Sequence, residues 1–399
     1  MMSRRFIFAL ICLMAFLSCT NRSWEGVTDE QYDDLDTGDP VPVVISMGGL
    51  QNGYVKGSGA VDAEDGRLWK DVDVYVYAFR KDAYSYSSAA TGGTTTLVDA
   101  SLDFPSSKLG RRAFYDGSDG YVTWADSDKD VFYPLGKQPY DFFAYYIDDL
   151  KVPSSSVSRN GKSVSFPVEI DGSRDLMSAH AEFSDNLVAG QGFSQYDILL
   201  MEQYAFSSWT ARRNVNPSLQ FKHHLSRLRF EIYPASEGAN TVYVNQIKVK
   251  SKTSARFTVA SGDYSSIGLD FGISNVRQDL SLCEQDGSAL KKNTYHTEYE
   301  GDFSEAVYER TGVQVGGTIL VAPDSSYEVA LTTYEAKEGG VELHPTPFTI
   351  KIDGGFKAGQ QYVVRLAVYG MMAVKPTVEV EAWGTGGNII LDEEDKYYK

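Results

Sequence analysis

LQFKHHLSRLRFEI, residues 219–232, alternates apolar and polar side chains along almost its whole length. A period of two is typical of a β-strand with one buried face. The alternation changes phase once, with Leu219, Phe221, His223 and Leu225 in the first phase and Leu228, Phe230 and Ile232 in the second. An extra residue in one strand produces such a shift, so the pattern predicts a β-bulge at Ser226-Arg227.

Similar strand-forming runs occur on both sides of this segment. They include residues 41–47, 72–79, 141–146, 162–168, 241–244, 319–321, 327–331, 348–352, 361–368 and 378–383. Gly-, Asp- and Ser-rich turns separate the runs, and helical periodicity is weak; residues 173–179 and 304–310 are each expected to form a turn or two of helix. Many short strands with few helices predict an all-β sandwich rather than an α/β fold.

The N-terminus carries an export signal. Arg4 and Arg5 precede an apolar segment at residues 6–16, and Leu17-Ser18-Cys19 follows. This pattern is typical of a bacterial lipoprotein signal peptide, residues 1–18, with Cys19 acylated as the first residue of the mature chain. The alternative is an ordinary cleaved signal with an incidental cysteine. The apolar segment is too short to cross about 30 Å of hydrocarbon easily as a helix, so a permanent membrane span is the weaker interpretation.

The mature chain divides into a tether and two domains. Residues 19–40 are acidic and show neither strand nor helix periodicity, which predicts a flexible tether. The polar stretch at residues 212–217 ends in proline and predicts a boundary, so the domains are residues 41–215 and 216–399. A cut after Pro234 is the alternative if the bulged strand belongs to the first sheet.

Composition limits the function. The chain has 37 basic and 54 acidic residues and a net charge of -17, which argues against a nucleic-acid partner. Of its three cysteines, Cys12 lies in the signal and Cys19 would carry lipid. Cys283 is then alone, so no intrachain disulfide is expected.

Motifs for catalysis or metal binding are incomplete. Gly161-Lys162-Ser163 ends like a P-loop but has Ser156 at the first glycine position, and His223 and His224 should point to opposite faces of a strand. The acidic run 126–130 starts like a calcium loop but continues with Val131 and Lys137, which excludes an EF-hand and leaves a looser carboxylate site as an alternative. We predict a protein that is not an enzyme, with no catalytic residues, no metal site and no cofactor.

Several segments resemble the fimbrillin family, the Mfa-like subunits of Bacteroidetes type V pili. They are Tyr133-Pro134-Leu135-Gly136, residues 141–146 (DFFAYY), Asp175-Leu176-Met177, residues 221–228 (FKHHLSRL), residues 317–323 (GTILVAP), residues 356–362 (FKAGQQY) and residues 383–388 (WGTGGN). Residues 221–228 are the most specific of the set, and the order of the segments spans nearly the whole mature chain. Ile147 departs from the pattern, because the family often has proline there.

The resemblance implies two tandem transthyretin-like β-sandwich domains after the lipoprotein signal peptide. It also implies lipid anchoring at the cell outer membrane, a surface-exposed fimbrium and a role in cell adhesion. In many members an Arg- or Lys-specific protease removes the first strand, and a strand from another pilin subunit takes its place by β-augmentation. The partners implied are therefore other pilin subunits, the outer membrane through the anchor, and a surface glycan or protein as the adhesion ligand.

In this chain residues 41–47 are the natural candidate for the removable strand. The candidate processing residues are Lys56 and Arg67, with Lys70 close by. Arg111-Arg112 is an alternative, and the absence of cleavage is another. Residues 388–391 are apolar enough for a short donor strand. The position of the subunit, as stalk, anchor or tip, stays open.

A surface carbohydrate-binding lipoprotein is the alternative function. Its β-sandwich would present exposed aromatic side chains that stack on sugar rings. The candidates are Trp24, Trp69, Trp124 and Trp209, although core packing is the competing explanation for Trp124.

Overall fold

The computed structural model describes residues 38–47, 72–81, 96–100, 109–116, 120–125, 130–147, 156–160, 163–237, 242–272, 276–335 and 340–381. Within these ranges the protein is mostly β-strand, with α-helices α3 (Gln195–Gln203) and α4 (Ser208–Ala211). Short 3-10 turns are η4 (Asp185–Leu187), η6 (Tyr264–Ser266) and η7 (Val307–Glu309). The all-β prediction is confirmed. The number of domains and the transthyretin-like fold stay predictions.

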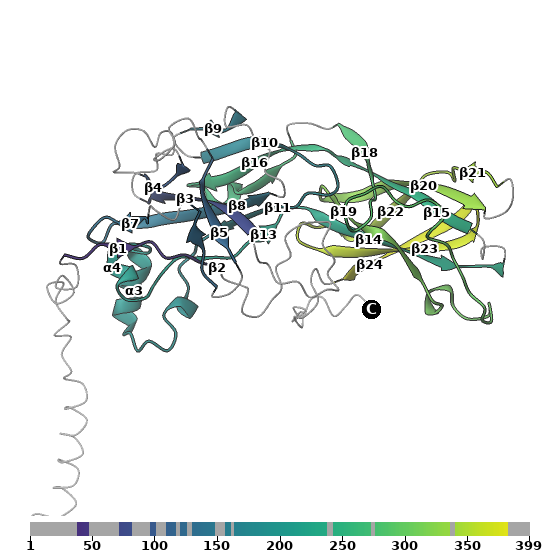
Figure 1. Cartoon of the computed structure of the whole chain (residues 1–399). Helices are drawn as coiled ribbons and strands as arrows, with labels where there is room; N and C mark the ends of the chain where they lie inside the picture. Colours follow the sequence, from purple (N-terminus) through teal and green to yellow (C-terminus); the bar gives the residue numbers. More distant parts are fainter. Residues whose placement is uncertain are drawn as a thin grey trace, which may run out of the picture.

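The first group of sheets forms one half of Figure 1. Its larger sheet has the order β13 (Lys222–His223), β11 (Leu176–His180), β8 (Tyr140–Ile147), β3 (Val72–Arg80), β5 (Arg111–Tyr115) and β6 (Thr123–Trp124), with β4 (Thr96–Val98) also paired to β3. The second sheet has the order β17 (Gly268–Asp270), β16 (Ser254–Ser261), β10 (Ser163–Glu169) and β9 (Ser158–Arg159). Two further pairs are β1 (Val41–Pro42) with β7 (Phe132–Tyr133) and β2 (Ser46–Met47) with β12 (Ser218–Leu219).

The second group forms the other half of Figure 1 and also has two sheets. One has the order β19 (Val313–Val321), β14 (Ser226–Pro234), β23 (Gln361–Gly370) and β24 (Ala373–Glu381). The other has the order β18 (Arg277–Ser281), β15 (Val242–Lys252), β20 (Asp324–Glu335) and β21 (Glu342–Leu343), with β22 (Phe348–Phe356) also paired to β20.

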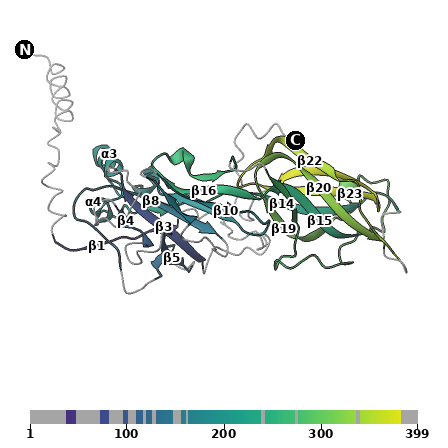
Figure 2. The same ribbon diagram turned by 90° about the horizontal axis from the view of Figure 1, so that it is seen from above.

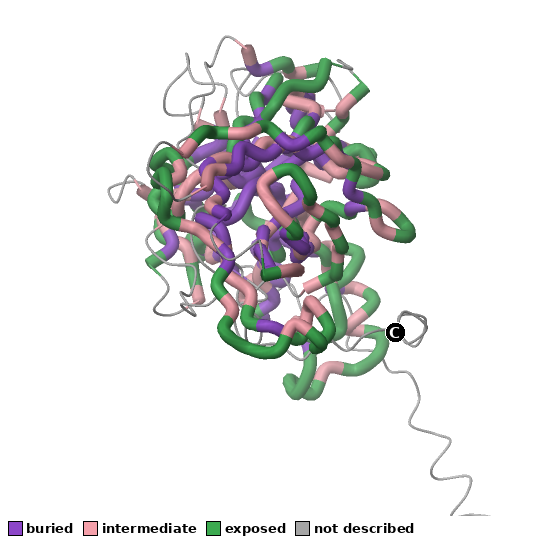
Figure 3. The backbone as a smooth tube through the Cα atoms, turned by 90° about the vertical axis from the view of Figure 1, so that its right-hand side faces the viewer, coloured by how far each residue is buried: buried purple, intermediate pink, exposed green. Residues whose placement is uncertain are grey.

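The buried residues, purple in Figure 3, gather in the interior of the trace, and most of them are apolar. In the first group the aromatic ring of Tyr145 on β8 lies 5.4 Å from that of Phe166 on β10, which joins the two sheets. The opposite face of the larger sheet, which includes Val74 and Phe142, forms a separate cluster with residues 41–47. The larger sheet is therefore buried on both faces, which explains why β8 is almost continuously apolar.

Residues 219–232 do not form one bulged strand, so the prediction of a β-bulge at Ser226-Arg227 is wrong. β13 pairs with β11 in the first group, whereas β14 pairs with β19 and β23 in the second group. The phase of the apolar side chains changes because the chain leaves one sheet and enters another between His223 and Ser226. Leu219 accordingly belongs to the core beneath residues 41–47, and Leu228 belongs to the other core.

The chain crosses between the groups a second time along β15 and β16. Thr253 separates the two strands, and its carbonyl accepts a hydrogen bond from the Ile170 N–H at 2.8 Å. β15 pairs with β20 in the second group, and β16 pairs with β10 in the first. Strands on both sides of residue 216 thus share a sheet, and the predicted boundary at residues 215 and 216 stays a prediction.

The two predicted helical turns have different outcomes. The range 173–179 is largely β11, so that helix prediction is wrong, whereas the range 304–310 contains η7. The helix α3 was not predicted, although Ser194 and Asp197 form a capping box at its start.

Candidate strand-exchange site

Residues 41–47, called the first strand below, are held by alternate side chains. Val41, Val43, Ile45 and Met47 are 8%, 6%, 1% and 3% exposed, whereas Pro42 is exposed. All four buried side chains belong to the core cluster of the larger sheet in the first group. The period of two expected for a half-buried strand is therefore present, although the regular pairing is limited to the short β1 and β2.

One edge of the first strand is hydrogen-bonded along its whole length. Two separate segments, residues 131–133 and 120–122, provide the antiparallel partners. At the start of the strand, Val41 lies opposite Tyr133, and the Val43 N–H donates to the Val131 carbonyl at 2.7 Å. Further along, the Val122 N–H donates to the Ile45 carbonyl at 3.0 Å. At the end of the strand, the Met47 N–H donates to the Gly120 carbonyl at 2.9 Å.

The other edge is paired at its C-terminal end. The Ser46 N–H donates to the Pro217 carbonyl at 3.0 Å, and β2 runs parallel to β12. Nearer the N-terminus this edge carries Pro42, which has no N–H to donate and is well suited to an unpaired edge. The first strand is therefore an edge strand at its beginning and an inserted strand at its end.

The chain just before the first strand is fixed by a side chain from α4. The Arg212 Nη2 donates to the Asp39 carbonyl at 2.5 Å. α4 is itself attached to the loop after β7, because the Ser208 hydroxyl donates to the Gly136 carbonyl and accepts from the Gly136 N–H, both at 2.9 Å. Figure 2 shows β1 beside α4, at the end of the molecule opposite β20 and β23. The segment predicted as a boundary, residues 212–217, thus helps to hold the first strand.

Removal of the first strand would uncover both apolar surface and backbone groups. The pockets filled by its four side chains would open to water, and the Gly120, Val131 and Pro217 carbonyls and the Val122 N–H would lose their partners. Exposed strand edges of this kind bind another extended chain readily. Apolar pockets beside unpaired backbone groups are the features that an exchange of one strand for another requires.

The predicted sites of modification fall mostly elsewhere. Cys19, Lys56, Arg67 and Lys70 lie outside the described residues. The alternative dibasic site, Arg111-Arg112, lies in β5, where Arg111 is opposite Val76 and is 8% exposed. A protease would have to separate β5 from β3 and β6 to cut there, which disfavours that alternative.

The adjacent histidines contact β11 and its start. The His223 Nδ1 lies 2.6 Å from the Asp175 Oδ2, and the His224 Nε2 lies 2.7 Å from the Ser178 Oγ. Burial, with smaller effects of His223 and Lys222, lowers the pKa of His224 to about 4 despite the opposing charge of Asp175. Among the described residues, no three or more His, Cys, Asp or Glu side chains are grouped to hold a metal ion. The two histidines therefore have structural partners.

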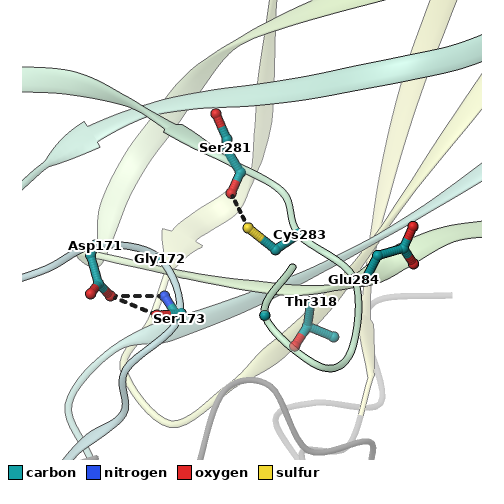
Figure 4. Close-up of a pocket in the computed structure, with 8 residues that line it drawn as sticks. Asp171, Gly172, Ser173, Ser281, Cys283, Glu284 and Thr318 are labelled. Carbon is teal, nitrogen blue, oxygen red and sulfur yellow. Dashed lines mark hydrogen bonds between the residues drawn. The ribbon is translucent and has the colours of Figure 1, made fainter. Parts of the chain in front are cut away.

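Cys283 lines a small cavity of about 140 Å³ between the turn at residues 171–173 and the chain after β18 (Figure 4). The Cys283 Sγ donates to the Ser281 carbonyl at 3.6 Å. Burial, together with Asp171 and Glu284, raises the pKa of the thiol and so disfavours the reactive thiolate. The residues that line the cavity include no histidine that could act as a base.

Of the tryptophans proposed for sugar stacking, the structure describes Trp124 and Trp209, and neither is well exposed. Trp209 is 1% exposed, with the Arg213 guanidinium 4.1 Å from its ring centre, so its expected role as a sugar platform is wrong. Trp124 is half-buried beside Arg111, whose guanidinium lies 5.0 Å from the ring centre. Trp24 and Trp69 lie outside the described residues.

Comparison with known proteins identifies the class. The fimbrillin-like family matches residues 86–383, so the chain belongs to the fimbrillin-like family. This membership supports a fimbrial subunit at the cell surface with a structural rather than an enzymatic role. No curated protein matches the chain. Within the described residues, no helix has the length and apolar character needed to span a membrane.

Solved structures of similar chains include cell adhesion candidates. A proposed cell adhesion protein from Bacteroides uniformis ATCC 8492 is 14% identical, with 87% of this chain and 99% of that chain covered and a TM-score of 0.47. One from Bacteroides ovatus ATCC 8483 is 12% identical, with 87% and 99% covered and a TM-score of 0.41. The fimbrial anchor protein Mfa2 from Porphyromonas gingivalis is 14% identical, with 88% and 100% covered and a TM-score of 0.32.

Proposed function

We propose that this protein is an adhesive pilus subunit, exported as a lipoprotein and assembled by strand exchange. Acyl chains on Cys19 anchor the newly exported chain to the outer membrane. Cleavage at Lys56 or Arg67 then separates the first strand from the rest of the chain, and a strand of another pilin subunit replaces it. Adhesion to a surface glycan or protein is the role of the assembled fimbrium.

One observation carries this proposal. The first strand fills its place with four alternate apolar side chains, yet its regular pairing is limited to β1 and β2. Its link to β3 runs through residues 48–71, where the candidate cleavage residues lie. A single cut there would leave the first strand attached by noncovalent contacts alone, which another strand can reproduce.

The proposal is tested by removing the cleavage residues. Replacing Lys56, Arg67 and Lys70 together with Gln should block oligomer formation in cells while the monomer stays folded. The matched control replaces three exposed lysines of the second group, Lys351, Lys357 and Lys375, with Gln. Pilus ladders on gels without boiling and circular dichroism of the monomer give the two measurements. Normal assembly of the first triple variant would show that these residues are not the switch.

Anchoring is tested separately. Cys19→Ala should release the protein from the outer membrane or leave it uncleaved, because two or more acyl chains hold a protein firmly at a membrane. Cys283→Ala should leave anchoring unchanged. Continued partition of the Cys19→Ala protein with washed membranes would contradict the lipoprotein assignment.

A further inference from the structure

The second sheet of the first group has a polar outer face. On β10 and β16 the side chains of Phe166 and Phe257 are fully buried in the core, with ring centres 5.8 Å apart. Successive side chains of a strand point to opposite faces, so Ser165 and Thr258 point away from that core. β9, β10 and β16 lie along the upper edge of the first group in Figure 1, and Ser158 on β9 is exposed. This face is therefore open to solvent.

A row of three hydroxyl groups crosses this outer face. Ser165 on β10 lies opposite Ser158 on β9 and opposite Thr258 on β16. Neighbouring strands are about 4.8 Å apart, so the three side chains are evenly spaced across the sheet. In the part of the chain that the structure describes, the Ser158 and Thr258 hydroxyls have no hydrogen-bond partner. Each hydroxyl can both donate and accept, so the row can bind a ligand with hydroxyls of its own.

Arg256 extends the row at one end. It lies two residues before Thr258 on the same face of β16, and its Nη1 donates to the Ser165 Oγ at 3.5 Å. The guanidinium thus leans toward β10 and away from β17, where Asp270 lies opposite Arg256. The Asp270 Oδ1 accepts a hydrogen bond from the Gly272 N–H at 2.8 Å instead. Among the described residues no carboxylate pairs with Arg256, so most of its five N–H donors remain available.

These side chains line a shallow hollow of about 720 Å³, a size typical of ligand sites. The end remote from Arg256 is fixed by two contacts. The Ser163 hydroxyl donates to the Asn160 Oδ1 at 3.2 Å, and the Ser266 hydroxyl donates to the Ser261 Oγ at 2.8 Å. Every lining side chain is polar, and Arg256 is the one that carries a charge. The hollow is therefore positive, although the whole chain has a net charge of -17.

This combination of groups favours an acidic sugar over a neutral one. The row of hydroxyls can exchange hydrogen bonds with sugar hydroxyls, and the guanidinium fork can hold a carboxylate through two parallel hydrogen bonds. A neutral sugar gains much of its affinity from stacking on an aromatic ring. The lining of the hollow includes no such ring, because Phe166 and Phe257 face the core. A carboxylate on the ligand supplies the missing affinity.

We propose that this hollow binds a glycan that carries a carboxylate. Arg256 holds the carboxylate, and Ser158, Ser165 and Thr258 contact the sugar hydroxyls. The inference rests on the adhesive role proposed above and names the chemical class of its ligand. The hollow and the first strand belong to different sheets, so binding of the glycan requires neither cleavage nor assembly.

Titration of the purified full chain with a panel of ligands tests the inference. The panel holds uronic-acid and sialic-acid oligosaccharides, the same oligosaccharides with each carboxylate reduced to an alcohol, and polyglutamate as an acidic peptide. Calorimetry should detect binding of a carboxylated glycan and at least about tenfold weaker binding of its reduced form, because the charge-assisted hydrogen bonds are lost. Binding of none of the carboxylated glycans would overturn the inference. Equal binding of the reduced form or of polyglutamate would overturn it as well.

Variants locate the site on the chain. Arg256→Gln should weaken binding at least about tenfold, and Arg256→Lys should recover only part of the loss, because lysine keeps the charge but not the fork. Thr258→Val removes one hydroxyl and should weaken binding about threefold. Arg112→Gln is the matched control, because Arg112 lies on β5 in the other sheet with its side chain 54% exposed. Circular dichroism confirms that each variant is folded.

Two readouts separate this inference from strand exchange. Unchanged affinity in Arg256→Gln would show that the glycan binds elsewhere and would overturn the assignment of the hollow. Pilus ladders from cells that carry Arg256→Gln should be normal, because the first strand and its partners are untouched. Loss of those ladders in this folded variant would make the face of β9, β10 and β16 an assembly surface, which would also contradict the inference.

Discussion

The first strand and β24 are both edge elements, but they are held in opposite ways. β24 pairs with β23 from Glu381 opposite Gln361 to Ala373 opposite Gly370, and none of its residues is buried. The first strand has a fragmented set of backbone partners, yet four of its side chains are almost inaccessible. β24 is thus held by the ladder to a single strand, whereas the first strand is held by hydrogen bonds to several separate segments and by four buried side chains. The proposed strand exchange concerns an element of the second kind.

The largest expected effect comes from truncating a pocket residue. Ile45→Ala in the uncut protein should destabilise the first group by about 2–5 kcal/mol, because it leaves a cavity in a buried site. Val380→Ala on β24 removes a side chain that is 56% exposed and should cost less than about 1 kcal/mol. Denaturant unfolding followed by circular dichroism measures both. Equal losses at the two positions would remove the contrast between the elements.

Acid should weaken the first group of sheets, where His224 contacts Ser178 on β11 and Phe257 on β16, before it affects β24. The pKa of His224 is lowered from its ordinary value of 6.5 to about 4 in the folded protein. Between these two pH values the unfolded chain therefore binds a proton at His224 that the folded chain does not bind. The stability contributed by neutral His224 is therefore complete above pH 6.5 and decreases as the pH falls toward 4, by up to about 3 kcal/mol. Unfolding measured at a series of pH values should show this slope.

A variant separates His224 from the other titratable groups. His224→Gln cannot take up the proton but keeps a polar group near Ser178, so the slope between pH 6.5 and 4 should become shallower. As the pH falls, hydrogen exchange should show a loss of protection at β11 and β13 at a higher pH than at β24. An unchanged slope in the variant would assign the acid response to other residues.

The smallest effect concerns the contact between Arg212 and Asp39. Arg212→Ala removes the hydrogen bond from the Arg212 guanidinium to the Asp39 carbonyl and should cost less than about 1 kcal/mol. Its readout is faster hydrogen exchange at Val43, with β24 unchanged. Arg365→Ala is the matched control, because Arg365 pairs with Glu379 across β23 and β24 at 2.8 Å. If Arg212→Ala left the exchange at Val43 unaltered, the contact would not help to hold the first strand.

The sequence predicted the all-β class because a period of two is a local signal, which is present in strands such as β14 and β20. It also placed a strand at residues 41–47. It failed where the outcome depends on distant partners. The phase shift after Leu225 was interpreted as a bulge, because nothing local indicates that β13 pairs with β11 while β14 pairs with β19 and β23.

The candidate site shows the same limit. Alternation of Val41, Val43 and Ile45 predicts a half-buried strand. The partners of its two edges lie about 80 and 170 residues further along the chain, at Tyr121 and Pro217, so no local pattern predicts them. Arg212 was assigned to a boundary because its neighbours are polar, whereas its side chain contacts Asp39. The helix α3 could have been found, since Ser194 and Asp197 have the spacing of a capping box.

The strand that continues from β15 into β16 has a mechanical consequence. A fimbrial subunit transmits tension between its neighbours, and here the two groups of sheets are joined by backbone that runs through Thr253. A load that separates the groups would pull β16 lengthwise along β10, from Glu169 opposite Ser254 to Ser163 opposite Ser261. The hydrogen bonds of that pair would be stressed together in shear rather than opened one by one. We therefore expect the junction to resist pulling better than the edge strands do.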